Sequence, residues 1–150
     1  MSDIYRQQNF GNRIGFGRSS ALLIVDFTVG FNDPKLFGGG NIDAAVQRSV
    51  RLLGFFRDRR LPVAFTRVVY ADDGSDAGVF CLKAPNLRTL TERAPAGQVV
   101  PELKPLDGEL VVDATFGAPA GSRFIVFSAT KRDVSSVVFI INALVLLDVV

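Results

Sequence analysis

One carboxylate in the sequence stands where chemistry could be done. Residues 21–26 form the run ALLIVD, which is apolar until it ends on Asp26, and a Gly- and Phe-rich loop follows. At the end of a buried strand, desolvation and a neighbouring charge can tune the pKa of a carboxyl group, as general acid–base chemistry requires. A strand that simply ends on a turn-forming Asp gives the same pattern, so both interpretations stay open.

Other residues with reactive side chains show weaker patterns. Residues 37–41, FGGGN, lack the GxGxxG and GK[ST] sequences of phosphate-binding loops and are more typical of a flexible loop. Cys81 has Lys83 nearby but no local base, which favours a small apolar filler over a nucleophile. The chain has no His, which excludes Ser-His-Asp and Cys-His catalysis and the usual His-bearing zinc sites within it. We expect no cofactor and no metal.

The elements around Asp26 follow a strand–helix–strand order. Residues 21–26 are apolar throughout, as in a strand of a parallel sheet that is buried on both faces. Asn41 is a plausible N-cap for a helix that ends before Pro62, and residues 62–70 are a β-branched and aromatic second strand. The helix is predicted to turn one stripe towards the sheet, formed by Ile42, Ala45, Val46, Ser49, Val50, Leu53 and Phe56.

The rest of the pattern predicts a three-layer α/β fold with a parallel sheet. A polar loop at 71–78 and a short helix within 84–94 precede a third strand at 108–113, and a fourth strand is predicted at 123–129. Ligands of such sheets gather outside the carboxyl ends of the strands, where the strand order reverses. Besides Asp26, the candidate positions are therefore Phe27 and Thr28, Arg67 to Asp73, Asp113 to Thr115, and Ser128 to Asp133.

Composition limits the classes of protein that fit. At 150 residues the chain is predicted to be one domain, 1–150, with an irregular arm at 1–20. A net charge of +2, spread along the chain, gives no basic face for nucleic acid. The apolar run 134–150 is shorter than the ~20 residues of a membrane span, which favours a buried helix or strand. A single Cys and the absence of a signal peptide indicate a cytoplasmic protein.

Several long motifs resemble those of one enzyme family. The stretches ALLIVDFTVGFNDP, FGGGNI, LPVAFTRVVYADDGSDAGVFCLKAP and VVPELKPLDGELVV resemble the isochorismatase-like cysteine hydrolases, most of all the N-carbamoylsarcosine amidase branch. The resemblance covers about residues 9–112. It implies an isochorismatase-like, Rossmann-like hydrolase fold, a homodimer or homotetramer, and hydrolysis of a small linear amide. In that scheme a Cys thiolate attacks the amide carbonyl and ammonia leaves, an Asp moves protons, and a Lys favours the thiolate.

The resemblance assigns only one member of this triad. Asp26 matches the family Asp, which makes it the expected catalytic acid. Ala114 stands where the family Lys is expected, and Asp133 stands in the place of the Cys. The likeness ends abruptly after Val112, as a frameshift or truncation would produce, so residues 113–150 are expected to be divergent and the fold incomplete at its C-terminal end.

Two hypotheses follow for the function. The chain is an amidohydrolase of the N-carbamoylsarcosine amidase type in which only the Asp is recognisable, or it is an inactive member of that family that at most associates with itself. We expect a small amide as the ligand and neither nucleic acid nor membrane as a partner. An incomplete sheet would leave an exposed edge, which predicts poor solubility.

Overall fold

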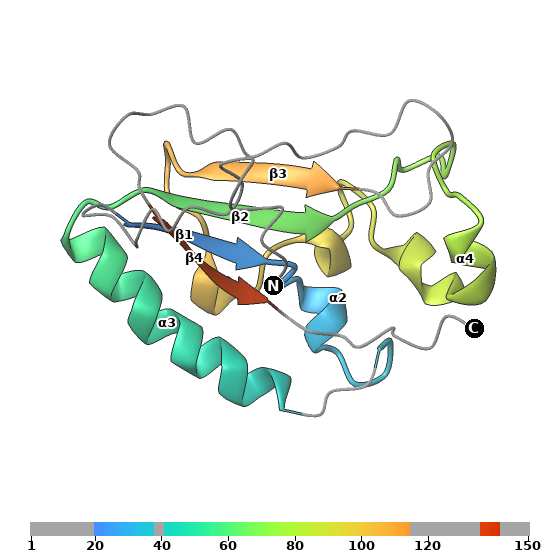
Figure 1. Ribbon diagram of the computed structural model, residues 1–150. Coiled ribbons are helices and arrows are strands. Elements are labelled where there is room, and N and C mark those ends of the chain that lie inside the picture. Colours follow the sequence, from blue (N-terminus) through green and yellow to red (C-terminus); the bar gives the residue numbers. More distant parts are fainter. Residues whose placement is uncertain (1–19, 38–40, 115–135, 142–150) are drawn as a thin grey trace, which may run out of the picture.

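Four parallel strands form the sheet in the described part of this chain (Figure 1). The computed structural model describes residues 20–37 and 41–114, and the main chain of residues 136–141. The strand order is β3-β2-β1-β4, with bounds β1 Ser20–Val25, β2 Val63–Val68, β3 Leu110–Ala114 and β4 Ser136–Ile141. The helical segments are α2 Val29–Asn32, α3 Ile42–Asp58, α4 Phe80–Lys83, and the 3-10 turns η1 Pro85–Thr89, η2 Pro95–Gly97 and η3 Pro101–Leu103.

Strand β1 lies inside the sheet, and both of its faces are covered by other parts of the protein. Leu22, Leu23 and Ile24 are exposed by only 1%, 3% and 1%, although neighbouring side chains of a strand point to opposite faces. The strand pairs with β2 on one side and with β4 on the other. The prediction of a strand buried on both faces is therefore confirmed.

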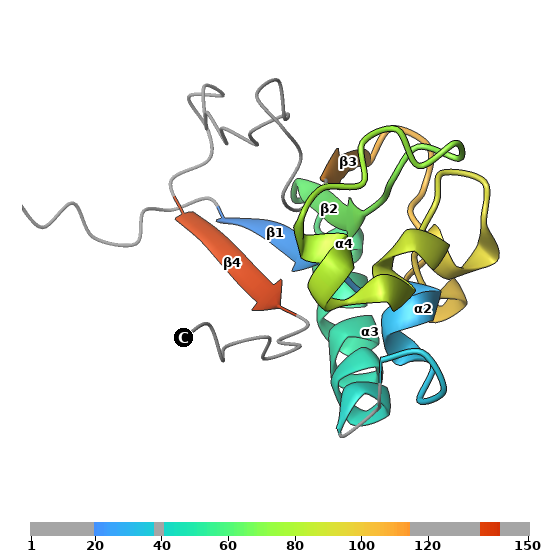
Figure 2. The same ribbon diagram turned by 90° about the vertical axis from the view of Figure 1, so that its right-hand side faces the viewer.

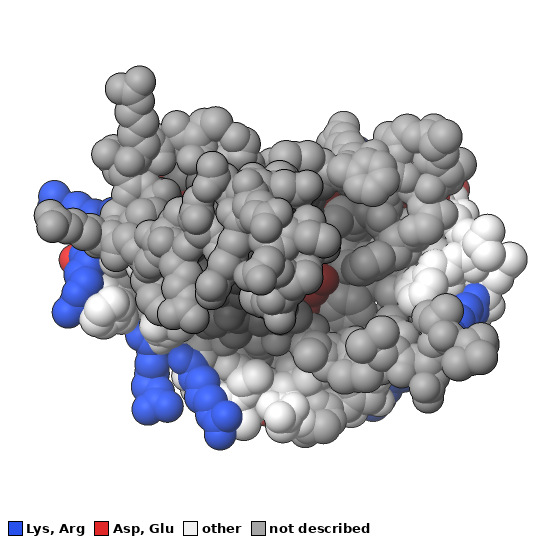
Figure 3. Space-filling view, in the orientation of Figure 1, with Lys and Arg blue, Asp and Glu red and all other residues white. Residues whose placement is uncertain are grey.

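Helix α3 packs its predicted stripe against the sheet. Ile42, Val46, Leu53 and Phe56 share one core cluster with Leu22 and Ile24 of β1 and Phe65 of β2. Asn41 precedes the helix, but its side chain makes no capping hydrogen bond. The exposed side chains of Arg48, Arg51 and Arg59 turn to solvent, and blue basic side chains gather over the position of α3 in Figure 3.

Several short helical segments lie beyond the carboxyl ends of the strands, whereas η3 packs with α3 in the first core cluster. Helices α2 and α4 stand in front of the strand tips when the sheet is viewed from that end (Figure 2). A second core cluster forms there from Phe31, Val68, Tyr70, Cys81, Leu87 and Leu90. The short helix predicted within 84–94 is the 3-10 turn η1.

The strand order reverses next to β1. The chain passes from β1 outward to β2 and β3, and β4 then pairs with the other edge of β1. This parallel arrangement confirms the predicted α/β class, and α3 supplies one helical layer. Ser20 belongs to β1 rather than to the predicted N-terminal arm.

The strand beside β1 comes from the apolar C-terminal run. Residues 136–141 form β4, so the strand alternative for the run 134–150 holds over that part. The strand predicted at 123–129, Asp133, most of the 1–20 arm and the glycines of FGGGN lie outside the described residues. Among the helices that the structure describes, none has the length and apolar character needed to cross a membrane.

Candidate active site

Asp26 lies at the carboxyl end of β1, beside the point where the strand order reverses. It directly follows Val25, which pairs with Thr66 of β2 and with Ile141 of β4. Open α/β sheets bind their ligands in this position, because the chain leaves in opposite directions from the two neighbouring strands. The predicted location of Asp26 is thus the observed one, while its catalytic role stays a prediction.

The backbone at Asp26 adopts an uncommon conformation. Its φ is 60°, in the left-handed region that few residues other than Gly occupy and that Asp tolerates better than most. The Asp26 N–H donates to the Thr66 carbonyl at 3.0 Å, and the Asp26 carbonyl accepts from the Thr28 N–H at 2.9 Å. Such conformations persist where surrounding contacts enforce them, and they are frequent at functional sites.

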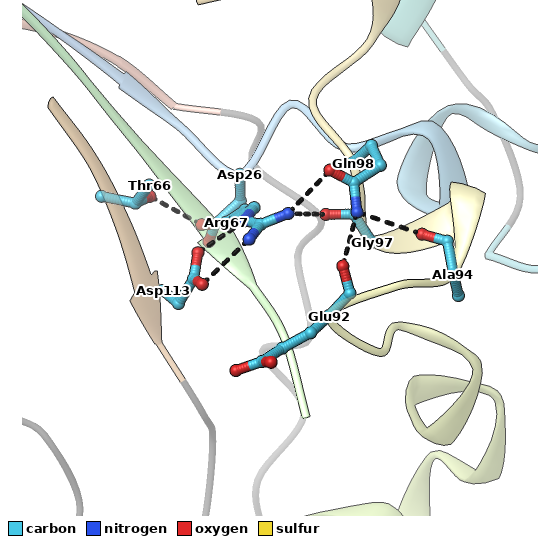
Figure 4. A network of polar contacts seen from close by, with 8 residues as sticks. All are labelled: Asp26, Thr66, Arg67, Glu92, Ala94, Gly97, Gln98 and Asp113. Carbon is cyan, nitrogen blue, oxygen red and sulfur yellow. Dashed lines mark hydrogen bonds and ion pairs between the residues drawn. The ribbon is translucent and has the colours of Figure 1, made fainter. Parts of the chain in front are cut away.

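The carboxyl group of Asp26 is partly buried and hydrogen-bonded (Figure 4). The Thr66 hydroxyl donates to Asp26 Oδ1 at 2.7 Å, and Thr66 is itself only 6% exposed. Burial raises the pKa of Asp26, because removal from water disfavours the carboxylate, and the hydrogen bond from Thr66 opposes part of this effect. The result is a carboxyl group that holds its proton to a higher pH than an ordinary Asp.

A second carboxylate, on the neighbouring strand β3, is paired with Arg67. Arg67 and Asp113 are register partners on β2 and β3. Arg67 Nη2 donates to Asp113 Oδ2 at 2.9 Å, and Arg67 Nε donates to Asp113 Oδ1, so the pair is bidentate. The two side chains are 16% and 34% exposed, which leaves the pair only partly screened by solvent.

Gln98 joins this pair and was missed by sequence reasoning. Arg67 Nη1 donates to Gln98 Oε1 at 2.9 Å, and the Gln98 amide donates to the Glu92 carbonyl at 2.7 Å. Figure 4 shows Gln98 and Asp113 on opposite sides of the Arg67 guanidinium. Gln98 follows a 3-10 turn and carries no periodic pattern that could have marked it. A pocket of about 510 Å³ opens against Arg67 and Gln98, next to β3 and η3.

The other predicted positions lie apart from this network. Asp73 is in an exposed loop, where hydrogen bonds from the Ser75 N–H and from the Ser75 side chain lower the pKa of Asp73. Thr28 is fully buried, and its hydroxyl has no hydrogen-bond partner in the described part of the chain. Thr115 and residues 128–133 lie outside the described residues.

Cys81 and Ala114 are the two described residues that bear on the nucleophile and the Lys expected from the family resemblance. Cys81 is 1% exposed within α4 and packs among the apolar side chains of the second core cluster, in line with the interpretation as an apolar filler. Ala114 ends β3, where it pairs with Val68 of β2. Its methyl group carries no charge. No cluster of three or more His, Cys, Asp or Glu side chains that could hold a metal occurs among the described residues.

Comparison with known proteins links this chain to one family. The sequence model of the isochorismatase domain matches residues 20–138. Maleamate amidohydrolase from Pseudomonas putida is 34% identical over 112 residues, which cover 73% of this chain and 52% of that protein. N-carbamoylsarcosine amidase from an Arthrobacter species is 28% identical over 142 residues, which cover 87% of this chain and 52% of that protein. The chain thus spans about half the length of these two relatives.

The fold has counterparts among solved structures. The crystal structure of a cysteine hydrolase from Pseudomonas syringae pv. phaseolicola 1448A matches with a TM-score of 0.63 at 22% identity. The match covers 81% of this chain and 58% of that chain. At this level of identity the likeness shows a shared fold.

Proposed function

Because this chain belongs to the isochorismatase family, we propose that its site is that of an amidohydrolase of the N-carbamoylsarcosine amidase type, in which Asp26 is the catalytic acid. The ligand class is a small linear amide or carbamoyl compound, and the reaction of this class releases ammonia. Two similar relatives, a maleamate amidohydrolase and an N-carbamoylsarcosine amidase, support this class without selecting one amide within it.

The observation that carries the proposal is the position, burial and hydrogen bonding of the Asp26 carboxyl group. A carboxyl group at the reversal point of the sheet, with a pKa raised by burial and an oxygen held by Thr66, suits proton transfer. In the family scheme such a group takes the proton of an attacking thiol and gives it to the leaving nitrogen. The Thr66 hydroxyl donates to Asp26 and so fixes the direction in which the carboxyl group points.

A second candidate is a non-catalytic family member that associates with itself. Ala114 favours it, because position 114 ends β3 and bears a methyl group where the resemblance expects an ammonium. The only Cys of these 150 residues is buried in α4, without a described base beside it. Loss of one member of a cooperating triad typically lowers the rate by about 10⁴-fold or more.

These two candidates make different predictions for ammonia release. The amidohydrolase predicts that the purified 150-residue chain releases ammonia from maleamate or N-carbamoylsarcosine above the buffer blank, and the non-catalytic family member predicts no release. Coupled enzymatic detection of ammonia, with Asp26→Asn and Cys81→Ala variants in parallel, measures this directly.

Each positive result would assign the residues of the site in its own way. Turnover that is lost in Cys81→Ala would make Cys81 the nucleophile, and turnover that survives it would place the nucleophile elsewhere. Turnover that Asp26→Asn leaves intact would remove Asp26 from the reaction. Asp73→Asn is the matched control, because Asp73 is exposed and its carboxyl group accepts from the Ser75 N–H rather than from Thr66.

Assembly and compartment belong to the same proposal. The family resemblance supports a homodimer or homotetramer, and a chain with one Cys suits a reducing cytoplasm. Size-exclusion chromatography with light scattering tests the first of these.

A further inference from the structure

The turn that carries Asp26 is held by a distant segment of the chain. The Val29 N–H donates to the Gln98 carbonyl at 2.8 Å, and the Val100 N–H donates to the Phe27 carbonyl at 3.0 Å. Thr28 and Val99 form an antiparallel bridge between these two bonds. Residues 27–29 therefore lie along residues 98–100 as a short two-stranded contact that begins one residue after Asp26.

The segment 98–100 is in turn fixed through the side chain of Gln98. Its amide nitrogen donates to the carbonyls of Glu92 and Ala94 at 2.7 Å and 3.4 Å. These bonds join the two ends of the loop that contains η2. Its amide oxygen accepts from Arg67 Nη1 at 2.9 Å. Arg67 is thus the side chain through which this loop is bonded to β2 (Figure 4).

Arg67 is suited to this task because its own position is fixed. Asp113 of β3 engages two of its nitrogens, which leaves Nη1 directed at Gln98. Arg67 also directly follows Thr66, whose carbonyl and hydroxyl hold the N–H and the carboxyl group of Asp26. Adjacent residues of β2 therefore hold the Asp26 turn, Thr66 directly and Arg67 by way of Gln98.

We infer that Arg67 is a positioning residue for Asp26, which it serves by holding Gln98 and with it the segment 98–100 against residues 27–29. This inference rests on the proposed role of Asp26 as the acid. A planar guanidinium can donate to Asp113 and to Gln98 at the same time, in directions that are fixed relative to each other. A Lys ammonium retains the charge beside Asp113 but lacks this planar geometry. Arg67→Lys therefore separates the effect of the charge from the effect of the two fixed donor directions.

The experiment compares two arginines that pair in the same way. Arg57 also makes a bidentate contact, to Glu109, at 2.8 Å and 2.7 Å, but it joins α3 to the turn before β3. Arg67→Lys and Gln98→Ala are the test variants, and Arg57→Lys is the matched control. The readouts are amide hydrogen exchange at Val29 and Val100, and the pKa of Asp26 from its carboxyl carbon shift.

Two results are expected if Arg67 positions Asp26. Exchange at Val29 and Val100 becomes at least about tenfold faster in Arg67→Lys and in Gln98→Ala, while Arg57→Lys leaves it unchanged relative to the rest of the chain. The pKa of Asp26 falls towards its ordinary value in both test variants, because a loosened turn admits water to the carboxyl group. Arg67→Lys keeps a cation beside Asp113, and Gln98→Ala changes no charge.

The inference is overturned if the test variants leave exchange at Val29 and Val100, and the pKa of Asp26, as they are in Arg57→Lys. Should Arg67→Lys fail to fold, Gln98→Ala alone decides, since it removes the same link from the other side. Neither readout depends on turnover. A failed ammonia assay therefore bears on the proposed function, while unchanged exchange and titration bear on Arg67.

Discussion

Asp26 combines two features that a merely structural turn residue does not need. Its backbone is in the left-handed region, and its carboxyl group is desolvated enough to raise its pKa despite the hydrogen bond from Thr66. Both features oppose folding, and the surrounding contacts must offset them. Groups that lower stability in this way are often retained because a site uses them.

This cost predicts how stability depends on pH. Since folding raises the pKa of Asp26, the folded state binds a proton more tightly than the unfolded state. The free energy of unfolding should therefore fall as the pH rises from the ordinary Asp value of 3.8 through the raised folded value. Asp26→Asn removes this fall, so we expect the variant to exceed the wild type in stability at neutral pH and to lose that advantage in acid.

Urea unfolding at several pH values measures the effect. Glu109→Gln is the control with the opposite sign. Although burial alone would raise the pKa of Glu109, the hydrogen bonds from Arg57 and the Leu106 N–H, together with the Arg57 charge, outweigh it and lower the pKa. A wild-type chain whose stability relative to Asp26→Asn does not decrease with pH would contradict the account of Asp26.

At this scale the sequence predicted the position of Asp26 but not its partners. Asp26 could be located because an apolar strand ends on it. The contact with Thr66 and the pair of Arg67 with Asp113 depend on the register of β1, β2 and β3, which no local pattern contains. Gln98 enters through a loop that tertiary contacts alone bring to β2.

Among the elements, the short turn η2 packs with little room to spare. A Cβ added at Gly97 would lie 2.3 Å from the Thr91 carbonyl oxygen, which is a main-chain atom that cannot easily move. Gly54 lies within α3, and a Cβ there would meet nothing within 4 Å. The two glycines thus differ in their surroundings, although each is a single Gly in a helical segment.

This difference predicts opposite effects of one substitution. Gly97→Ala should lower the free energy of unfolding by ~1–3 kcal/mol, because the loop must shift to relieve the overlap. Gly54→Ala should raise it by ~0.5–1 kcal/mol, because Ala loses less backbone entropy than Gly in a helix. Denaturant titration of both variants checks the pair. A Gly97→Ala variant as stable as Gly54→Ala would show that η2 is not closely packed.

Regular elements were predictable where periodicity was strong. The stripe of α3 and the continuous apolar run of β1 give unambiguous patterns, and the structure has both. Strand β2 ends at Val68, two residues earlier than predicted, because Tyr70 pairs with Thr91 instead of with a neighbouring strand of the sheet. The partner of β1 on its second side was harder to assign, since residues 123–129 and 134–150 both have β-branched, apolar sequences.

For the molecule as a whole, β3 forms one edge of the described sheet. Leu110 and Val111 on this strand are 56% and 37% exposed. Edge strands with exposed apolar side chains are templates for pairing with another chain, and natural edges often carry Lys, which prevents it. The expectation that an exposed edge lowers solubility stays a prediction.

We predict that the chain associates with itself through this edge. In sedimentation velocity the wild type should form species larger than the monomer as concentration rises, and Leu110→Lys should shift them towards the monomer. The substitution itself should change stability by no more than ~0.5 kcal/mol, because Leu110 is exposed. Val79→Lys is the control, since Val79 is 77% exposed but lies beside α4 and away from the edge. A wild type that sediments as a clean monomer at all concentrations would contradict this.

The central claim is that folding places a desolvated acid at the carboxyl end of β1. The most direct test is an NMR titration of the Asp26 carboxyl carbon, with Asp73 as the internal reference, because hydrogen bonds led by that from the Ser75 N–H lower the pKa of Asp73. We predict that Asp26 titrates at a higher pH than Asp73, and that Thr66→Val, which removes the hydroxyl donor, moves Asp26 higher still. An Asp26 that titrates with or below Asp73 would contradict the account.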